Sequence, residues 1–157
     1  MPHPSFLRAL LLALACSAAT TAVLAHGDVT PQPVDTSALT PLGADWRAEN
    51  PFRSNDQAVR IGTSAYNQNC ARCHGLEAVS GGIAPDLRKL DNECASLKDD
   101  GKRTVCVKEI DDYFLTTVRR GRSRNGAVYM PPFEGVMNQE AIWSIKAYLE
   151  TRRDKPL

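Results

Sequence analysis

The chain has few side chains that bind metals, and this scarcity excludes several kinds of site. Its 157 residues include five cysteines, three histidines and three methionines. Cys70 and Cys73 form a C-x-x-C pair, but a structural zinc site would need a second such pair or an H-x-x-x-H pattern, and the sequence has neither. A redox-active pair of the thioredoxin type would lie near a β-α-β pattern, which is also missing.

Charge imbalance and β-strand patterns are lacking as well. Lys and Arg total 19 and Asp and Glu total 18, so the formal net charge is +1 and bulk charge gives no reason to expect nucleic-acid binding. No apolar segment after the N-terminal region is long enough to span a membrane. Apolar residues recur at helical rather than alternating spacing, which predicts an all-α domain.

The first 25 residues have the features of a cleaved secretory signal peptide. Arg8 precedes a short apolar run over residues 9–22, and a small-residue cleavage site ends at Ala25. The run is rich in Ala and short for a membrane span, so an uncleaved anchor is the weaker interpretation. Cys16 lies in a sequence similar to a bacterial lipoprotein site, except that Ala stands where Leu is usual. The sequence therefore predicts export of the chain that follows residue 25.

The run Cys70-Ala-Arg-Cys-His74 is the most informative feature of the chain. C-x-x-C-H is the attachment motif of a c-type haem. Two thiols at this spacing can add to the two vinyl groups of one haem, and the adjacent histidine then reaches the iron as its proximal ligand. We therefore expect one covalently bound haem c at Cys70, Cys73 and His74.

Two cysteines remain once the haem motif and the predicted signal peptide are set aside. Cys94 and Cys106 would form an even pair in an oxidising compartment, which favours a disulfide over two free thiols. The bridge would close a charged, turn-rich loop over residues 95–105. A loop of this length contributes about 3 kcal/mol of stability by restricting the unfolded chain.

The exported chain divides into an extended arm over residues 26–53 and a helical domain over residues 54–157. Four prolines block regular helix in the arm, and its aromatic residues Trp46 and Phe52 indicate that it lies over the domain. Within the domain, cap residues and apolar spacing predict helices at about residues 56–69, 86–90 and 110–120, and after Asn138.

Few residues can serve as the second axial ligand of the iron. Outside the predicted signal peptide the candidates are Met130, Met137 and His26. Met130 heads a Met-Pro-Pro-Phe segment whose prolines stiffen the backbone, whereas Met137 could be a core residue and His26 lies at the far end of the arm. An open or water-bound position is a further alternative. We expect Met130 to be the ligand.

Over roughly residues 56–152 the chain resembles the class I cytochromes c. Gly62, Tyr66 and Cys70 match the N-terminal helix of that family, in which Gly allows close crossing by an aromatic of the C-terminal helix, here Tyr148. The stretch 83–87 resembles the family's Pro-x-Leu element. The resemblance implies the class I cytochrome c fold, with helices packed around one covalently bound haem.

The resemblance also implies roles for individual residues at the haem. The carbonyl of Pro85 would accept a hydrogen bond from His74 Nδ1, which fixes the ring and tunes the ligand. Met130 matches the axial Met of the family, and Met ligation raises the reduction potential relative to ligation by two histidines.

A narrower likeness is to the cytochromes c-550 that accept electrons from quinoprotein (PQQ-dependent) alcohol dehydrogenases. Residues 26–35, 67–77 and 119–130 carry this likeness. It implies a soluble, monomeric, periplasmic electron carrier rather than an enzyme. Such a dehydrogenase would be the electron donor, and a terminal oxidase or another cytochrome would be the acceptor.

Basic residues gather just before the Met-Pro-Pro segment, at Arg119, Arg120, Arg122 and Arg124. We interpret them as a docking patch that steers an acidic partner to the haem edge. Neutralisation of haem propionates and a merely solvated face are the alternatives. Two other functions also remain open: a haem enzyme or gas-binding protein with an open distal site, and a haem subunit of a larger oxidoreductase.

Overall fold

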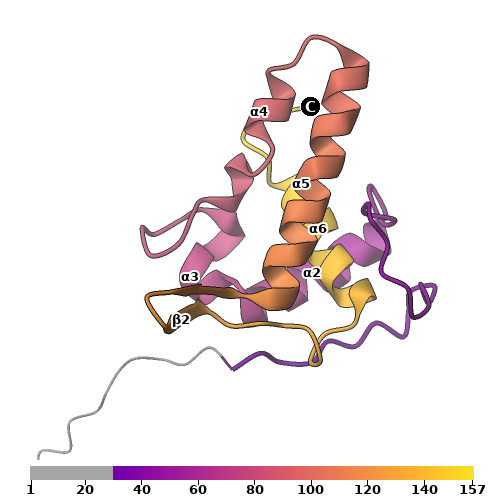
Figure 1. The fold of residues 1–157 in the computed structure, drawn as a ribbon. Helices are drawn as coiled ribbons and strands as arrows, with labels where there is room; N and C mark the ends of the chain where they lie inside the picture. The colour runs from indigo at the N-terminus through magenta and orange to yellow at the C-terminus, as the bar shows by residue number, and fades with distance from the viewer. Residues whose placement is uncertain (1–29) are drawn as a thin grey trace, which may run out of the picture.

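A computed structural model describes residues 30–157, so the predicted signal peptide, Cys16 and His26 lie outside the described residues. The described chain is mostly helical, with one small β-hairpin and a long N-terminal arm (Figure 1). Within residues 30–157, no helix has the length and apolar character needed to cross a membrane.

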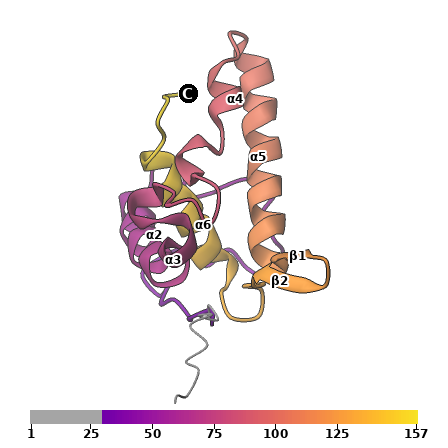
Figure 2. The same ribbon diagram turned by 90° about the vertical axis from the view of Figure 1, so that its left-hand side faces the viewer.

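Helices α2 and α6 cross each other and form the centre of the core (Figures 1 and 2). Helix α2 spans Asp56–Asn69 and α6 spans Gln139–Thr151. Each is preceded by an asparagine, Asn55 or Asn138, whose side chain accepts a hydrogen bond from the backbone N–H three residues further on. Both predicted helix starts are therefore confirmed.

Gly62 allows α2 and α6 to approach closely. A Cβ atom at this position would lie 1.9 Å from the carbonyl oxygen of Ser144, which is impossible without a shift of backbone. Tyr148, which the resemblance implied as the aromatic of this crossing, packs on Tyr66 of α2 with ring centroids 5.2 Å apart. The glycine thus accommodates the backbone of α6, and the aromatic pair lies beside the crossing.

The long helix α5 spans Asp100–Arg120 and corrects the prediction of a loop over residues 95–105. Asp99 caps it by accepting a hydrogen bond from the N–H of Lys102. Its first turns are largely exposed, so the sequence there has no apolar stripe from which a helix could be recognised. Together with α4 (Asn92–Ala95), these turns extend beyond the crossing of α2 and α6 (Figure 2).

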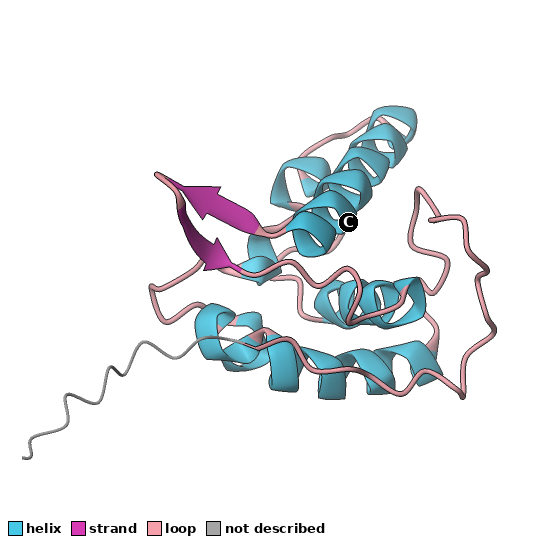
Figure 3. Cartoon of the chain, turned by 60° about the horizontal axis from the view of Figure 1, so that its bottom comes forward, coloured by secondary structure: helices cyan, strands magenta, loops and turns pink. Residues whose placement is uncertain are grey.

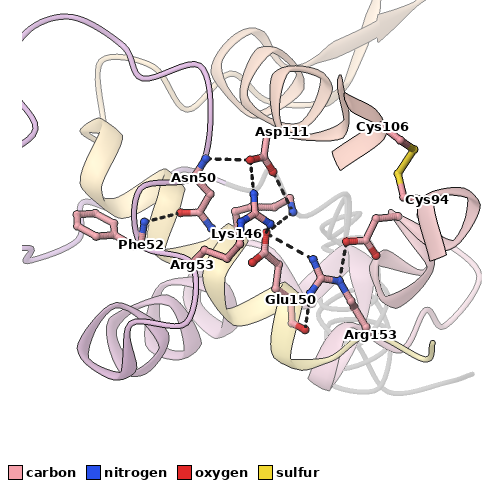
Figure 4. A network of polar contacts seen from close by, with 10 residues as sticks. Asn50, Phe52, Arg53, Cys94, Cys106, Asp111, Lys146, Glu150 and Arg153 are labelled. Atoms are coloured by element: carbon pink, nitrogen blue, oxygen red, sulfur yellow. Dashed lines mark hydrogen bonds and ion pairs between the residues drawn. A yellow bond between two sulfur atoms is a disulfide. The ribbon is translucent and has the colours of Figure 1, made fainter. Parts of the chain in front are cut away.

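The predicted disulfide between Cys94 and Cys106 is present and joins α4 to α5 (Figure 4). Its Cα atoms lie 5.5 Å apart, a usual spacing for such a bridge. The short helix predicted near residues 86–90 is the 3₁₀ turn η2 (Leu87–Lys89), which Asp86 caps. Two further short helices follow α2 along the chain, α3 (Ala71–His74) and η1 (Leu76–Ala78).

A two-stranded antiparallel hairpin corrects the prediction that the domain contains only helices. Strand β1 (Arg122–Arg124) pairs with β2 (Ala127–Met130), and the hairpin extends away from the end of α5 (Figure 3). Asn125 and Gly126 form its turn with φ values of 52° and 79°. Asn-Gly is a strong signal for such a turn, but the strands are exposed on both faces and lack apolar alternation.

The arm over residues 30–53 has no helix or strand and runs along the outside of the helices (Figure 3). Leu39 and Phe52 are buried in the core. Gln139, at the start of α6, binds the arm backbone through both polar atoms of its side chain. Its Oε1 accepts a hydrogen bond from the N–H of Arg47, and its Nε2 donates to the carbonyl of Gly43. The prediction that the arm lies over the helices is confirmed for these residues.

A network of buried ions connects the arm with α5 and α6 (Figure 4). The fully buried carboxylate of Asp111 lies 2.5 Å from Arg53 Nη2 and 3.2 Å from Lys146 Nζ. Lys146, only 1% exposed, also lies 2.7 Å from Glu150 Oε1. The backbone N–H of Asn50 donates to Asp111 as well. Because each buried charge has an oppositely charged partner, the desolvation penalty is offset.

Candidate haem site

An apolar cavity of about 640 Å³ contains every residue that the sequence assigned to the haem. Its volume falls within the range of about 300–1,000 Å³ that is usual for small-molecule and cofactor sites. Cys70, Cys73, His74, Pro85 and Met130 all line it. The remaining wall is mainly aliphatic and aromatic, and includes Leu87, Leu90, Phe114, Val118, Phe133, Ile145 and Leu149.

The C-x-x-C-H motif forms a single helical turn, α3, directly after α2. The carbonyl of Cys70 accepts hydrogen bonds from the N–H groups of Cys73 and His74. The side chains of these three residues therefore extend from one tight turn. The sulfur atoms of Cys70 and Cys73 are both free. Gly75 ends the turn at φ 79°, and a Cβ there would lie 1.8 Å from the carbonyl oxygen of Val79.

Tyr66 fixes the end of this turn from α2. Its side chain is fully buried, and its hydroxyl donates a 2.8 Å hydrogen bond to the carbonyl of Gly75. Burial raises the pKa of Tyr66, so the hydroxyl keeps the proton that it donates. The core of the molecule thus sets the position of the haem motif.

His74 has the hydrogen bond that the family resemblance implied. Its Nδ1 lies 2.8 Å from the carbonyl oxygen of Pro85. Because a carbonyl can only accept, Nδ1 is the donor, and in the neutral imidazole this leaves Nε2 with a free lone pair. That tautomer is the one a neutral imidazole needs in order to bind a metal through Nε2.

Met130 ends strand β2 and is held against the end of α5. Gly121, with φ 67°, ends that helix, and a Cβ on it would lie 2.4 Å from the carbonyl oxygen of Met130. The N–H of Phe133 donates to the carbonyl of Val118 at 3.0 Å. Met130 is half-buried, whereas the alternative candidate Met137 is buried in the core and does not line the cavity.

The four arginines of the basic run have different surroundings. Arg119 pairs with Glu134 at 2.6 Å. Arg122 lines the cavity and its guanidinium carbon lies 5.2 Å from the ring centroid of Tyr113. Arg120, Arg122 and Arg124 are all exposed, whereas Arg119 is half-buried. The run is therefore not a uniform surface patch, because two of its members make contacts within the chain.

Some residues at the site gave no signal in the sequence. Tyr113 and Thr117 line the cavity from α5, and Thr117 accepts a hydrogen bond from Arg122. Trp46 of the arm lies against Arg119, with 4.1 Å between the guanidinium carbon and the ring centroid. The contact between Trp46 and Arg119 joins positions far apart in the chain, so no local pattern could reveal it.

Comparison with known proteins gives one consistent family. Residues 57–149 match the family described as cytochrome c oxidase, cbb3-type, subunit III. Cytochrome c550 of Pseudomonas aeruginosa is 51% identical over 145 residues, which cover 90% of each chain. No solved structure matches.

Two larger enzymes match part of the chain. The quinohemoprotein alcohol dehydrogenase ADH-IIG of Pseudomonas putida is 35% identical over 103 residues, which are 65% of this chain and 12% of the enzyme. The quinohemoprotein alcohol dehydrogenase ADH IIB of the same organism is 28% identical over 106 residues, or 68% of this chain and 13% of the enzyme. This chain thus spans only a small part of either enzyme's length.

The donor set in the cavity fits the cofactor of this family. Two free thiols lie one helical turn apart, and the adjacent imidazole has its Nδ1 proton bound by a carbonyl. All three face an apolar cavity, as a low-polarity macrocycle requires. The chain belongs to the cytochrome c family: it is an electron-transfer protein whose cofactor is a covalently bound haem c.

Proposed function

We propose that this protein is a soluble periplasmic electron carrier with the class I cytochrome c fold. His74 and Met130 would be the two axial ligands of its iron. Its electrons would come from a quinoprotein alcohol dehydrogenase and pass to a terminal oxidase or another cytochrome of the respiratory chain. The observation that carries the proposal is that both ligand candidates and both motif cysteines line one apolar cavity.

Each residue of the site would have a distinct task. When bound, the haem supplies a one-electron Fe(II)/Fe(III) couple. Cys70 and Cys73 would anchor it covalently, and the carbonyl of Pro85 would hold His74 in the tautomer that binds through Nε2. Met130 would occupy the remaining axial position. The aliphatic and aromatic wall would exclude water from the iron, so that few water molecules have to reorient when the iron changes its charge.

The proposed donor rests on the relatives. The same chain is similar to a cytochrome c550 over 90% of its length and to a part of two quinohemoprotein alcohol dehydrogenases. This chain is related to a separate cytochrome and also to a part of two quinohemoprotein alcohol dehydrogenases. We therefore infer that an alcohol dehydrogenase of this class is its electron donor. The location rests on the predicted signal peptide over residues 1–25, followed by the arm over 26–53 and the cytochrome domain over 54–157.

Docking of the donor would depend on the exposed members of the basic run that make no contact within the chain. Arg120 and Arg124 are exposed and not held by the contacts that engage Arg119 and Arg122. Reversal of both charges, as Arg120→Glu with Arg124→Glu, should slow electron transfer from an acidic donor and flatten its dependence on salt. Lys102→Glu is the control, since Lys102 is equally exposed but lies at the far end of α5.

The proposed function is tested by reduction of the oxidised holoprotein in a stopped-flow instrument. A quinoprotein alcohol dehydrogenase with its alcohol should reduce the haem at a rate that rises with enzyme concentration and falls with salt. The final absorbance change should correspond to one electron per protein. If dehydrogenases of this class reduce the haem no faster than the alcohol alone does, the proposed donor is wrong.

A further inference from the structure

The segment that carries Met130 depends on the last turn of α5. The N–H of Phe133 donates to the carbonyl of Val118, and the N–H of Glu134 donates to the carbonyl of Arg119 at 3.3 Å. These bonds hold the chain that follows Met130 directly to the end of the helix. The position of the Met130 side chain over the cavity therefore depends on what fixes this turn.

Arg119 extends that connection to the N-terminal arm. Its Nη2 donates to Glu134 Oε1 at 2.6 Å, and its guanidinium carbon lies 4.1 Å from the ring centroid of Trp46. Trp46 is itself partly buried against the core. A single side chain thus contacts both the arm and the segment that follows Met130.

These contacts are better formed than an ordinary surface ion pair. The Arg119 side chain is only 23% exposed, with the indole of Trp46 on one face of its guanidinium. Trp is the most favourable partner for such a cation–π contact. The neighbouring guanidinium also lowers the pKa of Glu134, so this carboxylate is ionised at neutral pH.

We propose that Trp46, Arg119 and Glu134 form a brace that keeps the Met130 segment closed over the haem. Docking of the arm then sets how easily an external ligand can replace Met130 on the iron. This inference rests on the proposed role of Met130 as an axial ligand. Arg119 is a positioning residue here, because it acts on Met130 only through residues 131–134.

Displacement of Met130 by imidazole in the oxidised holoprotein measures the brace directly. The apparent affinity for imidazole is reduced by the fraction of molecules whose segment is open, so a weaker brace gives tighter binding. Arg119→Met removes both contacts and should raise the apparent affinity about tenfold, the effect expected for loss of one ion pair and one cation–π contact. Trp46→Leu and Glu134→Gln each remove one contact and should give smaller increases, and Arg119→Lys should restore part of the wild-type value.

A second pair between the arm and α5 provides the matched control. Lys108 Nζ lies 2.9 Å from Glu49 Oε1, so this pair joins the same arm to the same helix about three turns away from Arg119. Lys108→Met should leave the imidazole affinity unchanged. Denaturant unfolding of each variant measures its global stability. The brace predicts that the imidazole affinity changes without a matching change in the free energy of unfolding.

The outcomes separate the brace from the proposed ligation. Suppose that the oxidised wild-type protein shows the weak Met–iron band at the red end of its spectrum. If the brace variants then bind imidazole no better than wild type does, the brace is wrong and Met130 ligation stands. An equal effect of Lys108→Met and Arg119→Met would also overturn the brace. Absence of the band in the wild type would contradict Met130 ligation itself. If Arg119→Met does not fold, Trp46→Leu and Glu134→Gln decide the question.

Discussion

His74 and Met130 are held by different means. His74 lies in a helical turn, and the hydrogen bond from its Nδ1 to the carbonyl of Pro85 fixes the orientation of the ring. Among the described residues the Met130 side chain has no hydrogen bond of this kind; it packs half-buried against the core, and its carbonyl lies close to Gly121. We therefore expect the bond from His74 to the iron to persist under conditions that release Met130.

The two methionines of the described chain allow a matched test of the second ligand. Met130→Leu should abolish the weak red band of the oxidised protein, because Leu keeps the volume of the side chain but has no sulfur. Met137→Leu should retain the band, since Met137 is buried in the core and does not line the cavity. The absorption spectra of the two oxidised holoproteins provide the measurement. Loss of the band only in Met137→Leu would reverse the assignment.

At the scale of elements, the crossing of α2 and α6 depends on the absence of a side chain at Gly62. Gly62→Ala should destabilise the holoprotein by about 3 kcal/mol, because the new Cβ would displace the Ser144 carbonyl and overpack the crossing. Gly81→Ala is the control, since a Cβ there has no atom within 4 Å. Urea unfolding checks both variants. A midpoint for Gly62→Ala equal to that of wild type would contradict the close crossing.

The disulfide should stabilise α4 and the first turns of α5 without affecting the haem. Replacement of both cysteines, as Cys94→Ser with Cys106→Ser, should lower the free energy of unfolding by about 3 kcal/mol. Hydrogen exchange should then increase mainly over residues 92–108. The haem spectrum should stay unchanged, because the cavity residues of α5 begin only at Tyr113. A changed spectrum would show that the bridge also shapes the cavity.

Elements with a local chemical signal could be predicted from the sequence. The starts of α2 and α6 follow from Asn55 and Asn138, and the end of α5 follows from Gly121. The sequence predicts a loop for the first half of α5 because this half buries little apolar surface, and only the cap residue Asp99 marks its start. The hairpin had a recognisable Asn-Gly turn, but its exposed strands have no apolar alternation.

At the scale of the whole molecule, buried charges connect the arm to the helices. Lys146→Met should cost about 3–5 kcal/mol, because Asp111 and Glu150 would lose a buried cation that pairs with both. Lys108→Met, which breaks an exposed pair, should cost about 1 kcal/mol or less. Denaturant unfolding compares the two. Equal losses would mean that the buried network contributes no more than a surface pair.

The haem motif and the candidate axial ligands could be picked out from the sequence because their residue types are rare in this chain. Five cysteines and three methionines leave few ways to build one haem site. The contacts that support the site from the arm could not be predicted from the sequence. Trp46 and Arg119 meet only because the arm is fixed along α6 through Gln139, and no spacing in the sequence encodes that contact.

An iron bound by both His74 and Met130, as proposed, is closed on both faces and transfers electrons without binding a substrate. Carbon monoxide binds reduced haem only where an axial position is open, so the spectrum of the reduced holoprotein at neutral pH, with and without carbon monoxide, shows whether the Met130 side is closed. The wild-type spectrum should stay unchanged, whereas Met130→Leu should bind carbon monoxide rapidly. Immediate binding of carbon monoxide by the wild-type protein would mean that Met130 does not close the iron.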